Sequence, residues 1–183
     1  LLRQLQRFDE AVESYDIALQ LYPEDRSANW AAYYMRGIAL ERAKRWDRAE
    51  QDFRKALELN PNDPGVLNYL GYSYLDRGEN LEEARRLIEM AYDRRPNDGY
   101  IIDSLGWVFY VMGNYEEAVV YLERAVEATP ADATINDHLG DAYWKVGRRN
   151  EARFQWERAL GLDPDDEQRE AIQGKLERGI AQN

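Results

Sequence analysis

The stretch from Gly99 to Asp132, GYIIDSLGWVFYVMGNYEEAVVYLERAVEATPAD, decides the fold, because its small, apolar and turn-forming residues return in the same order along the chain. Its central glycine is one of four that are spaced by 34, 35 and 34 residues: Gly37, Gly71, Gly106 and Gly140. Prolines at positions 61, 96, 130 and 164 follow these glycines by 24 or 25 residues, and Pro23 continues the series upstream. The chain is therefore built from a repeat of about 34 residues.

Alignment on the glycines gives four repeats, at residues 30–63, 64–98, 99–132 and 133–166. In the second half of each repeat, two alanines flank one large apolar residue. Small residues let two helix backbones approach closely while a large one fills the space between them, so each repeat is predicted to be a pair of helices. The residues at these three places are Ala49, Phe53 and Ala56; Ala84, Ile88 and Ala91; Ala118, Leu122 and Ala125; and Ala152, Trp156 and Ala159.

Turn and cap residues recur as well. Gly78, Gly113 and Gly147 are predicted to form the turn between the two helices, and the prolines are predicted to end the second helix. One extra residue near Glu79 and Asn80 predicts a loosened turn in the second repeat. An aspartate follows each proline and is predicted to cap the next helix, because a short carboxylate accepts the free amide hydrogens of the first turn. These aspartates are Asp63, Asp98, Asp132 and Asp166.

The two ends differ from the middle. Residues 1–29 hold a partial repeat, in which Leu1 to Gln6 match the last turn of a first helix and Phe8 to Pro23 match a second helix. Four extra residues between 24 and 30 predict a longer first helix in the next repeat. Residues 167–183 are predicted to form a polar capping helix, as a solenoid needs to cover its last apolar face. We therefore expect one continuous solenoid domain that is a fragment of a longer array and ends in its cap.

These residues resemble the tetratricopeptide repeat, in which small and large residues stand at the same places. The resemblance implies an all-α, right-handed superhelical solenoid of antiparallel helix pairs whose first helices line a concave groove, and it implies an adaptor or scaffold that binds proteins or peptides. Four stretches are also similar to the C-terminal repeats of bacterial envelope proteins of this class, some of them outer-membrane lipoproteins that hold a processing protease near its substrates. That similarity implies a periplasmic or outer-membrane-associated place. The stretches are Asn68-Tyr-Leu-Gly-Tyr, Asp103-Ser-Leu-Gly-Trp-Val, His138-Leu-Gly-Asp and Gly147-Arg-Arg-Asn-Glu-Ala-Arg.

Composition narrows the choice of partner. The net charge of −11 argues against nucleic acid, which needs clustered Lys and Arg, and favours a basic or neutral protein. The absence of cysteine removes disulfides, thiolate catalysis and zinc-thiolate sites, and it leaves the compartment open. No apolar run approaches the roughly 20 residues of a membrane-spanning helix. We expect no cofactor and no metal.

The resemblance places six positions of each first helix on the concave groove, and in this chain they are rich in aromatic and acidic residues. Tyr and Trp offer flat apolar area with a hydrogen-bonding edge, which is typical of recognition surfaces, while the carboxylates would meet Lys or Arg of a partner. Each aromatic ring alone is as compatible with packing between helices. The predicted partner-binding residues are Asn68, Tyr69, Tyr72, Tyr100, Asp103, Trp107, Tyr110, Asp137, His138, Asp141, Trp144 and Lys145.

Other functions were weighed against peptide binding. Ser104 and His138, with Asp137 and Asp141 nearby, suggest a hydrolase, but residues on neighbouring helices about 10 Å apart do not normally place a serine oxygen on an imidazole. A metal site at His138 and Asp141 would have too few ligands, so a solvated or hydrogen-bonded surface histidine is the better interpretation. The lysine and asparagine with which some family members hold a carboxyl terminus are missing. Self-assembly through the aromatic residues remains an alternative.

Overall fold

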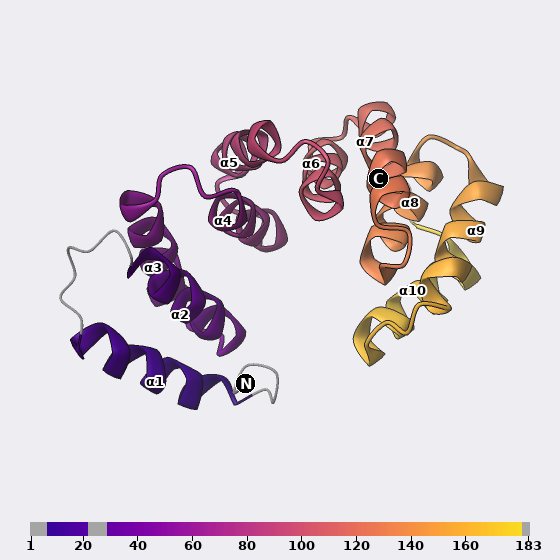
Figure 1. The fold of residues 1–183 in the computed structure, drawn as a ribbon. Helices are drawn as coiled ribbons and strands as arrows, with labels where there is room; N and C mark the ends of the chain where they lie inside the picture. The colour runs from indigo at the N-terminus through magenta and orange to yellow at the C-terminus, as the bar shows by residue number, and fades with distance from the viewer. Residues whose placement is uncertain (1–6, 22–28, 181–183) are drawn as a thin grey trace. The chain divides into compact units, whose positions relative to one another are not determined.

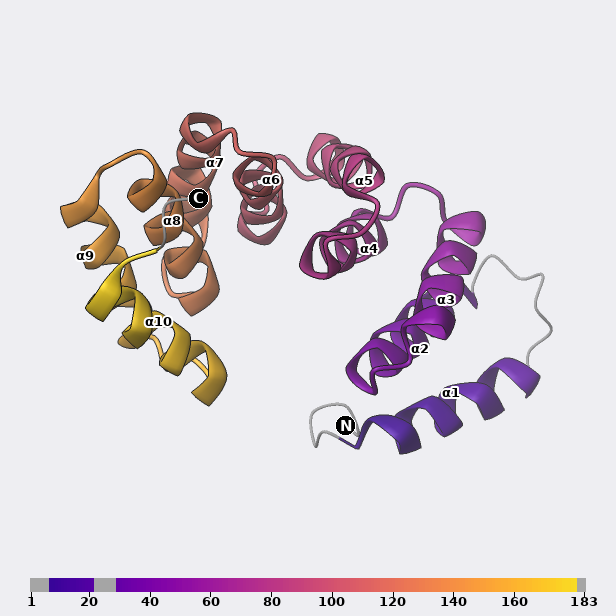
Figure 2. The ribbon, with the colours of Figure 1, turned by 180° about the vertical axis from the view of Figure 1, so that it is seen from behind.

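The computed structural model describes residues 7–21 and 29–180, and within them every regular element is an α-helix. The predicted all-α class is confirmed. Figure 1 follows the helices along the chain, and Figure 2 shows the same helices from behind. The described helices are α1 (Phe8–Leu21), α2 (Trp30–Arg42), α3 (Trp46–Leu59), α4 (Pro64–Arg77), α5 (Leu81–Arg94), α6 (Gly99–Val111), α7 (Tyr115–Ala128), α8 (Ala133–Lys145), α9 (Arg149–Leu160) and α10 (Asp166–Arg178).

The chain divides into two compact units, residues 1–70 and 71–183. The first holds α1, α2, α3 and the first half of α4, and the second holds the rest of α4 and the helices up to α10. The expectation of one continuous solenoid domain stays a prediction. Ten of the twelve predicted binding residues lie in the second unit, which is therefore the part that matters most for the site.

The recurring glycines let the two helices of a pair touch. A methyl group added at Gly106 would lie 2.7 Å from Leu122, and one at Gly140 would lie 2.5 Å from Trp156. Leu122 and Trp156 are both fully buried, each between two fully buried alanines of its own helix. Each large side chain thus fills the space that its glycine leaves free, which explains why these two residue types recur in step.

The turns follow the predicted pattern. Gly78, Gly113 and Gly147 have φ angles of 64°, 82° and 84°, a left-handed backbone that glycine adopts without strain. In the second repeat the extra residue brings a second left-handed position, since Asn80 has a φ of 48°. Lys44 takes the corresponding place in the first repeat with a φ of 59°, although its residue type gave no sign of this.

Three of the four predicted caps are confirmed. The carboxylates of Asp63, Asp98 and Asp132 accept hydrogen bonds from backbone N–H groups in the first turns of α4, α6 and α8. The prediction for Asp166 is wrong, because Asp165 accepts the bond from the N–H of Gln168 at 2.9 Å and Asp166 is already the first helical residue. The last helix begins one residue earlier in the repeat than the others do.

Each end of the described chain carries one helix, α1 and α10. Helix α1 buries Ala11 and Val12, as a second helix of a pair would. The predictions for residues 1–6 and for a longer helix across 24–28 lie outside the described residues; α2 begins at Trp30. Helix α10 buries Ile172 alone among its residues. Its role as the cap of the array stays a prediction. Within the described residues, no helix combines the length and the apolar character needed to cross a membrane.

Candidate binding site on the first helices

Two of the predicted residues lie in the first compact unit. Tyr69 donates a hydrogen bond from its hydroxyl to Glu41 at 3.1 Å, and its ring centroid lies 5.2 Å from that of Phe53. Burial raises the pKa of Tyr69, and the charge of Glu41 raises it further. The Oδ1 atom of Asn68 is buried and has no hydrogen-bond partner among the described residues. Tyr69 is thus fixed by packing, while Asn68 keeps an unused acceptor.

In the second unit, five rings from four helices follow one another, and we call them the aromatic stack: Tyr72, His138, Trp107, Tyr110 and Tyr115. At its centre the indole of Trp107 lies nearly parallel to the His138 imidazole, with centroids 3.9 Å apart, and to the Tyr110 ring, at 4.4 Å. Tyr72 lies 6.5 Å from His138, and Tyr115 meets Tyr110 edge-on at 5.4 Å. Trp107 and Tyr110 remain partly exposed, so the stack is rigid and still reachable.

A hydrogen bond joins His138, on α8, to Asp103, on α6. The Nδ1 atom of the imidazole lies 3.0 Å from one oxygen of Asp103 and 3.1 Å from the other, and both side chains are buried. Burial alone would lower the pKa of His138, but the charge and hydrogen bond of Asp103, with the charges of Asp137 and Asp141, outweigh it and raise the pKa. The interpretation of a surface histidine is wrong in one respect: the imidazole is hydrogen-bonded but lies under Trp107 and away from solvent.

The carboxylates of Asp137 and Asp141 meet a cation of the chain itself. The ammonium group of Lys175, on α10, lies 2.8 Å from an oxygen of each. Asp141 also accepts a hydrogen bond from Trp156 Nε1 at 2.8 Å. Burial raises the pKa of Asp141 to about 6, although Lys175 and Trp156 act to lower it. The acidic residues of this surface are therefore already compensated, and their contact with a partner's cation stays a prediction.

The remaining predicted residues differ in how many contacts they make within the chain. Trp144 donates its indole N–H to the carbonyl of Ile180 at 2.9 Å, and the guanidinium of Arg149 lies 3.8 Å from its ring centroid. The ammonium of Lys145 lies 5.6 Å from the centre of the Tyr115 ring. Tyr100 is 58% exposed, more than any other tyrosine or tryptophan among the described residues. Tyr100 is thus free to meet a partner, whereas Trp144 is held by Ile180 and Arg149.

The residues of the hydrolase alternative are engaged elsewhere. Ser104 donates its hydroxyl hydrogen to the carbonyl of Tyr100, one turn back on its own helix, at 3.0 Å. The Nδ1 atom of His138 faces Asp103. Among the described residues, no group of three or more His, Asp or Glu side chains is placed to hold a metal ion. The geometry offers no activated nucleophile here.

Sequence reasoning missed Tyr115 and Lys175. Tyr115 opens a second helix, so the list of first-helix positions did not contain it, and only its contact with Tyr110 brings it into the stack. Lys175 stands 34 residues after Asp141 and therefore at the same place of the next repeat. A lysine on the repeat that follows two aspartates was a signal that could have been used.

Helix pairs that pack through a glycine and a large side chain, repeated along the described chain, define a helical-repeat scaffold. The chain belongs to the tetratricopeptide repeat family. Models described as "Tetratricopeptide repeat" match residues 1–64, 34–99 and 133–166, and one described as "TPR repeat" matches 106–147. Proteins with this architecture generally act as scaffolds for protein interactions.

Two curated bacterial relatives share part of the chain. The TPR repeat-containing protein PA4667 of Pseudomonas aeruginosa is 33% identical over 105 residues, which are 57% of this chain and 17% of the relative. Bacteriophage adsorption protein A of Escherichia coli is 34% identical over 82 residues, 45% of this chain and 8% of the relative. The chain thus spans less than a fifth of the length of either relative.

Solved structures share the fold. A TPR protein of Thermus thermophilus, TTC0263, has a TM-score of 0.77 and 23% identity, covering 96% of this chain and 93% of its own. Pseudomonas aeruginosa PilF has a TM-score of 0.75 and 17% identity, covering 97% and 86%. YrrB, described as a TPR protein with an unusual peptide-binding site, has a TM-score of 0.66 and 21% identity, covering 95% and 87%. At these identities the agreement concerns the fold alone.

Proposed function

We propose that the chain is an adaptor module that binds a peptide or protein segment along the aromatic stack, with Trp107 and Tyr110 as the main contacts and the exposed Tyr100, on the same helix, as a further one. The observation that carries the proposal is the position of Trp107, held parallel between His138 and Tyr110 and still partly exposed. A ring that is already ordered loses little entropy when it binds, so its apolar area contributes to affinity.

The partner of this surface is neutral or basic. Lys175 already compensates Asp137 and Asp141, and Asp103 is hydrogen-bonded to His138, so the stack itself selects for apolar contact and not for charge. The net charge of −11 acts at longer range, where it speeds the approach of a basic partner and slows that of an acidic one. Salt should therefore slow association with a basic partner more than it weakens the final complex.

Site-specific photocrosslinking tests this proposal. A photoreactive amino acid in place of Tyr110 should capture the partner in cells, whereas the same group in place of Val120, an exposed residue of α7, should not. Trp107→Ala should then weaken binding of the purified partner at least tenfold. Tyr110→Ala provides a second test with less effect on packing, and circular dichroism confirms that both variants fold.

The outcomes separate the alternatives. Equal capture from positions 110 and 120 would argue against the stack as the binding surface. If the captured partner is a second copy of the chain, and light scattering shows a dimer that Trp107→Ala abolishes, the stack is a self-assembly interface. Hydrolysis of generic ester or peptide substrates that is lost in both Ser104→Ala and His138→Gln would support the enzyme alternative, which the hydrogen bond of Ser104 to Tyr100 disfavours.

For the compartment, we propose the bacterial envelope. The similarity of the repeats to envelope adaptors supports it, as does the match to Bacteriophage adsorption protein A, while the match to a Pseudomonas protein supports only that the chain is bacterial. Fractionation of cells that express the full-length gene product tests it: recovery of the protein in the cytoplasmic fraction alone would contradict the proposal.

A further inference from the structure

Trp107, at the centre of the aromatic stack, has both faces of its indole ring covered. The imidazole of His138 is inclined to the indole by 13° and the ring of Tyr110 by 7°, with centroids 3.9 and 4.4 Å away. Two rings this close to one centroid cannot share a face, so they lie on opposite sides of the indole. The side chain of Trp107 is nevertheless partly exposed. It therefore presents the edge of its ring to a partner and not a face.

The edge of an indole carries one polar group, the Nε1–H, which can only donate a hydrogen bond. In Trp144 and Trp156 this group is used within the chain: it donates to the carbonyl of Ile180 at 2.9 Å and to Asp141 at 2.8 Å, respectively. The Nε1–H of Trp107 has no acceptor among the described residues, and it is not shut off from solvent. A donor held in a fixed position is thus available to a partner.

The hydroxyl of Tyr110, one turn further along α6, also has no hydrogen-bond partner among the described residues. A phenol hydroxyl can donate or accept. Burial raises the pKa of Tyr110, and the charges of Asp141 and Asp137 raise it further, so the hydroxyl keeps its proton. Two adjoining rings therefore offer one donor and one group of either kind, which is what the C=O and N–H groups of a peptide backbone require.

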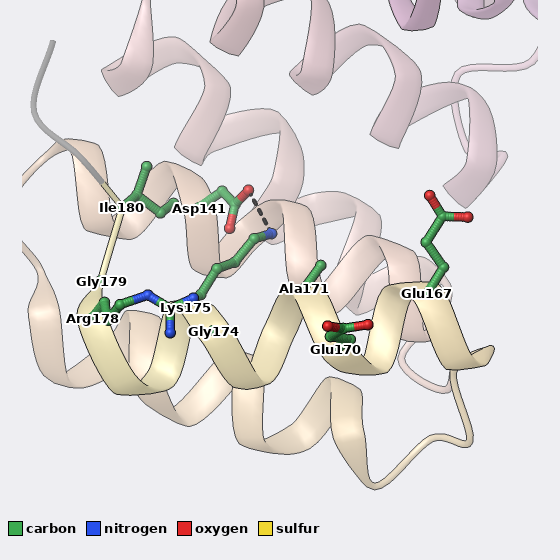
Figure 3. A pocket seen from close by; sticks show the side chains of 9 residues that line it. All are labelled: Asp141, Glu167, Glu170, Ala171, Gly174, Lys175, Arg178, Gly179 and Ile180. Carbon is green, nitrogen blue, oxygen red and sulfur yellow. Dashed lines mark hydrogen bonds and ion pairs between the residues drawn. The ribbon is translucent and has the colours of Figure 1, made fainter.

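The charges beside the stack argue against an anionic acceptor. Lys175 contacts Asp141, as Figure 3 shows, and its ammonium group also contacts Asp137. Asp103, one turn before the indole on α6, faces His138. Two cations thus face three carboxylates, which leaves no surplus of positive charge to attract a carboxylate of the partner. The acceptor that fits the indole N–H is neutral, as a carbonyl group is.

The backbone of the partner can supply such a carbonyl only where the carbonyl is not already bonded. Within a helix the carbonyls accept bonds from N–H groups four residues later, whereas an extended segment has no internal hydrogen bonds. We propose that Trp107 donates its indole hydrogen bond to a main-chain carbonyl of an extended peptide segment, and that a neighbouring N–H of this segment bonds to the hydroxyl of Tyr110. This rests on the proposed function, because it names the conformation and the recognised groups of the segment that binds at the stack.

Peptide selection provides the probe. A phage library of random linear peptides is selected on the immobilised chain after depletion on Trp107→Ala, and the most enriched peptide is synthesised with a fluorescein label for anisotropy. Trp107 is then replaced by benzothienylalanine, in which sulfur stands in place of the N–H and the shape of the ring is kept. The affinity should fall about fivefold, as for the loss of one hydrogen bond. The same replacement at Trp30, a partly buried residue of the first compact unit, should leave the affinity unchanged.

An ester scan of the peptide identifies the acceptor. An ester in place of a peptide bond makes the carbonyl a weaker acceptor. At the contacted position it should weaken binding to the unchanged chain more than binding to the chain with benzothienylalanine, a non-additivity typical of groups that touch. In NMR spectra the indole proton of Trp107 should move downfield and exchange more slowly with water when the peptide binds. The indole protons of Trp144 and Trp156, which are already bonded, should change little.

The outcomes distinguish this proposal from the proposed function. Equal affinities of the unchanged chain and the chain with benzothienylalanine at Trp107 would overturn the proposal and leave peptide binding at the stack intact. So would an ester scan without a coupled position, because the acceptor would then be a side chain. Contacts between residues three apart in NMR spectra of the bound peptide would show a helix and overturn it as well. A selection that enriches no peptide dependent on Trp107 would overturn both.

Discussion

Two glycines at the same place of successive repeats should respond in opposite ways to alanine. In Gly140→Ala the new methyl group would lie 2.5 Å from the ring of Trp156 and 3.1 Å from the carbonyl oxygen of Ala152. Trp156 is fully buried and hydrogen-bonded to Asp141, so it cannot move away freely. Overpacking of this kind costs up to about 3 kcal/mol, and the better helix propensity of alanine returns about 1 kcal/mol. The expected net loss is about 2 kcal/mol.

In Gly174→Ala the methyl group meets only the flexible end of Arg178, so the gain of about 1 kcal/mol in helix propensity remains. Thermal unfolding followed by circular dichroism should show a midpoint about 4–8 °C lower for Gly140→Ala and about 2–4 °C higher for Gly174→Ala. Urea unfolding should give the same order. If both variants shift in the same direction by similar amounts, the contact with Trp156 does not explain the glycine, and the packing argument fails.

Three further changes probe the contacts near the stack and the cap. The pKa of His138 is raised in the folded chain, so its hydrogen bond to Asp103 stabilises the fold fully below about pH 6.5 and less as the pH rises through the folded-state pKa. Urea unfolding at a series of pH values should show this decline in stability. His138→Gln should remove the pH dependence. Lys175→Met leaves two buried carboxylates without their cation and should cost about 3–5 kcal/mol in urea unfolding; a loss below 1 kcal/mol would show that solvent reaches them. Asp165→Ala should cost about 1 kcal/mol and Asp166→Ala less than about 0.5 kcal/mol, and equal costs would contradict the assigned cap.

The fold could be predicted from the sequence because each repeat encodes it locally. The recurring glycine, the two alanines and the large residue between them pack against one another within one helix pair. Each turn glycine determines the backbone only of the short turn in which it stands. The same residue pattern recurs four times, so the helix pair of a repeat that departs from the pattern at one position can still be predicted from the other repeats. Lys44 and Asp165 depart from the pattern, and at those two places the local backbone did not follow from the repeat.

The candidate site could be predicted only in part. The positions of Trp107 and Tyr110 on a first helix follow from the period, but their parallel contact depends on side-chain rotamers that no period encodes. The period also brings Asp141 and Lys175 to the same place of successive repeats, but it does not show how close their charged atoms come. Asp103 faces His138 and Asp141 faces Lys175, contacts between residues 34 or 35 positions apart that require the packed structure.

The lysine on α10 has a consequence for the exchange of repeats between proteins. Its ammonium group is matched to two aspartates of the preceding repeat, at distances that leave both carboxylates compensated. Helix α10 therefore cannot be exchanged freely for the first helix of another repeat. Joined to an array whose last repeat lacks Asp137 and Asp141, it would bury an uncompensated cation. An engineer who transfers α10 to another array must therefore transfer α8 with it, because the lysine and its two aspartates work only together.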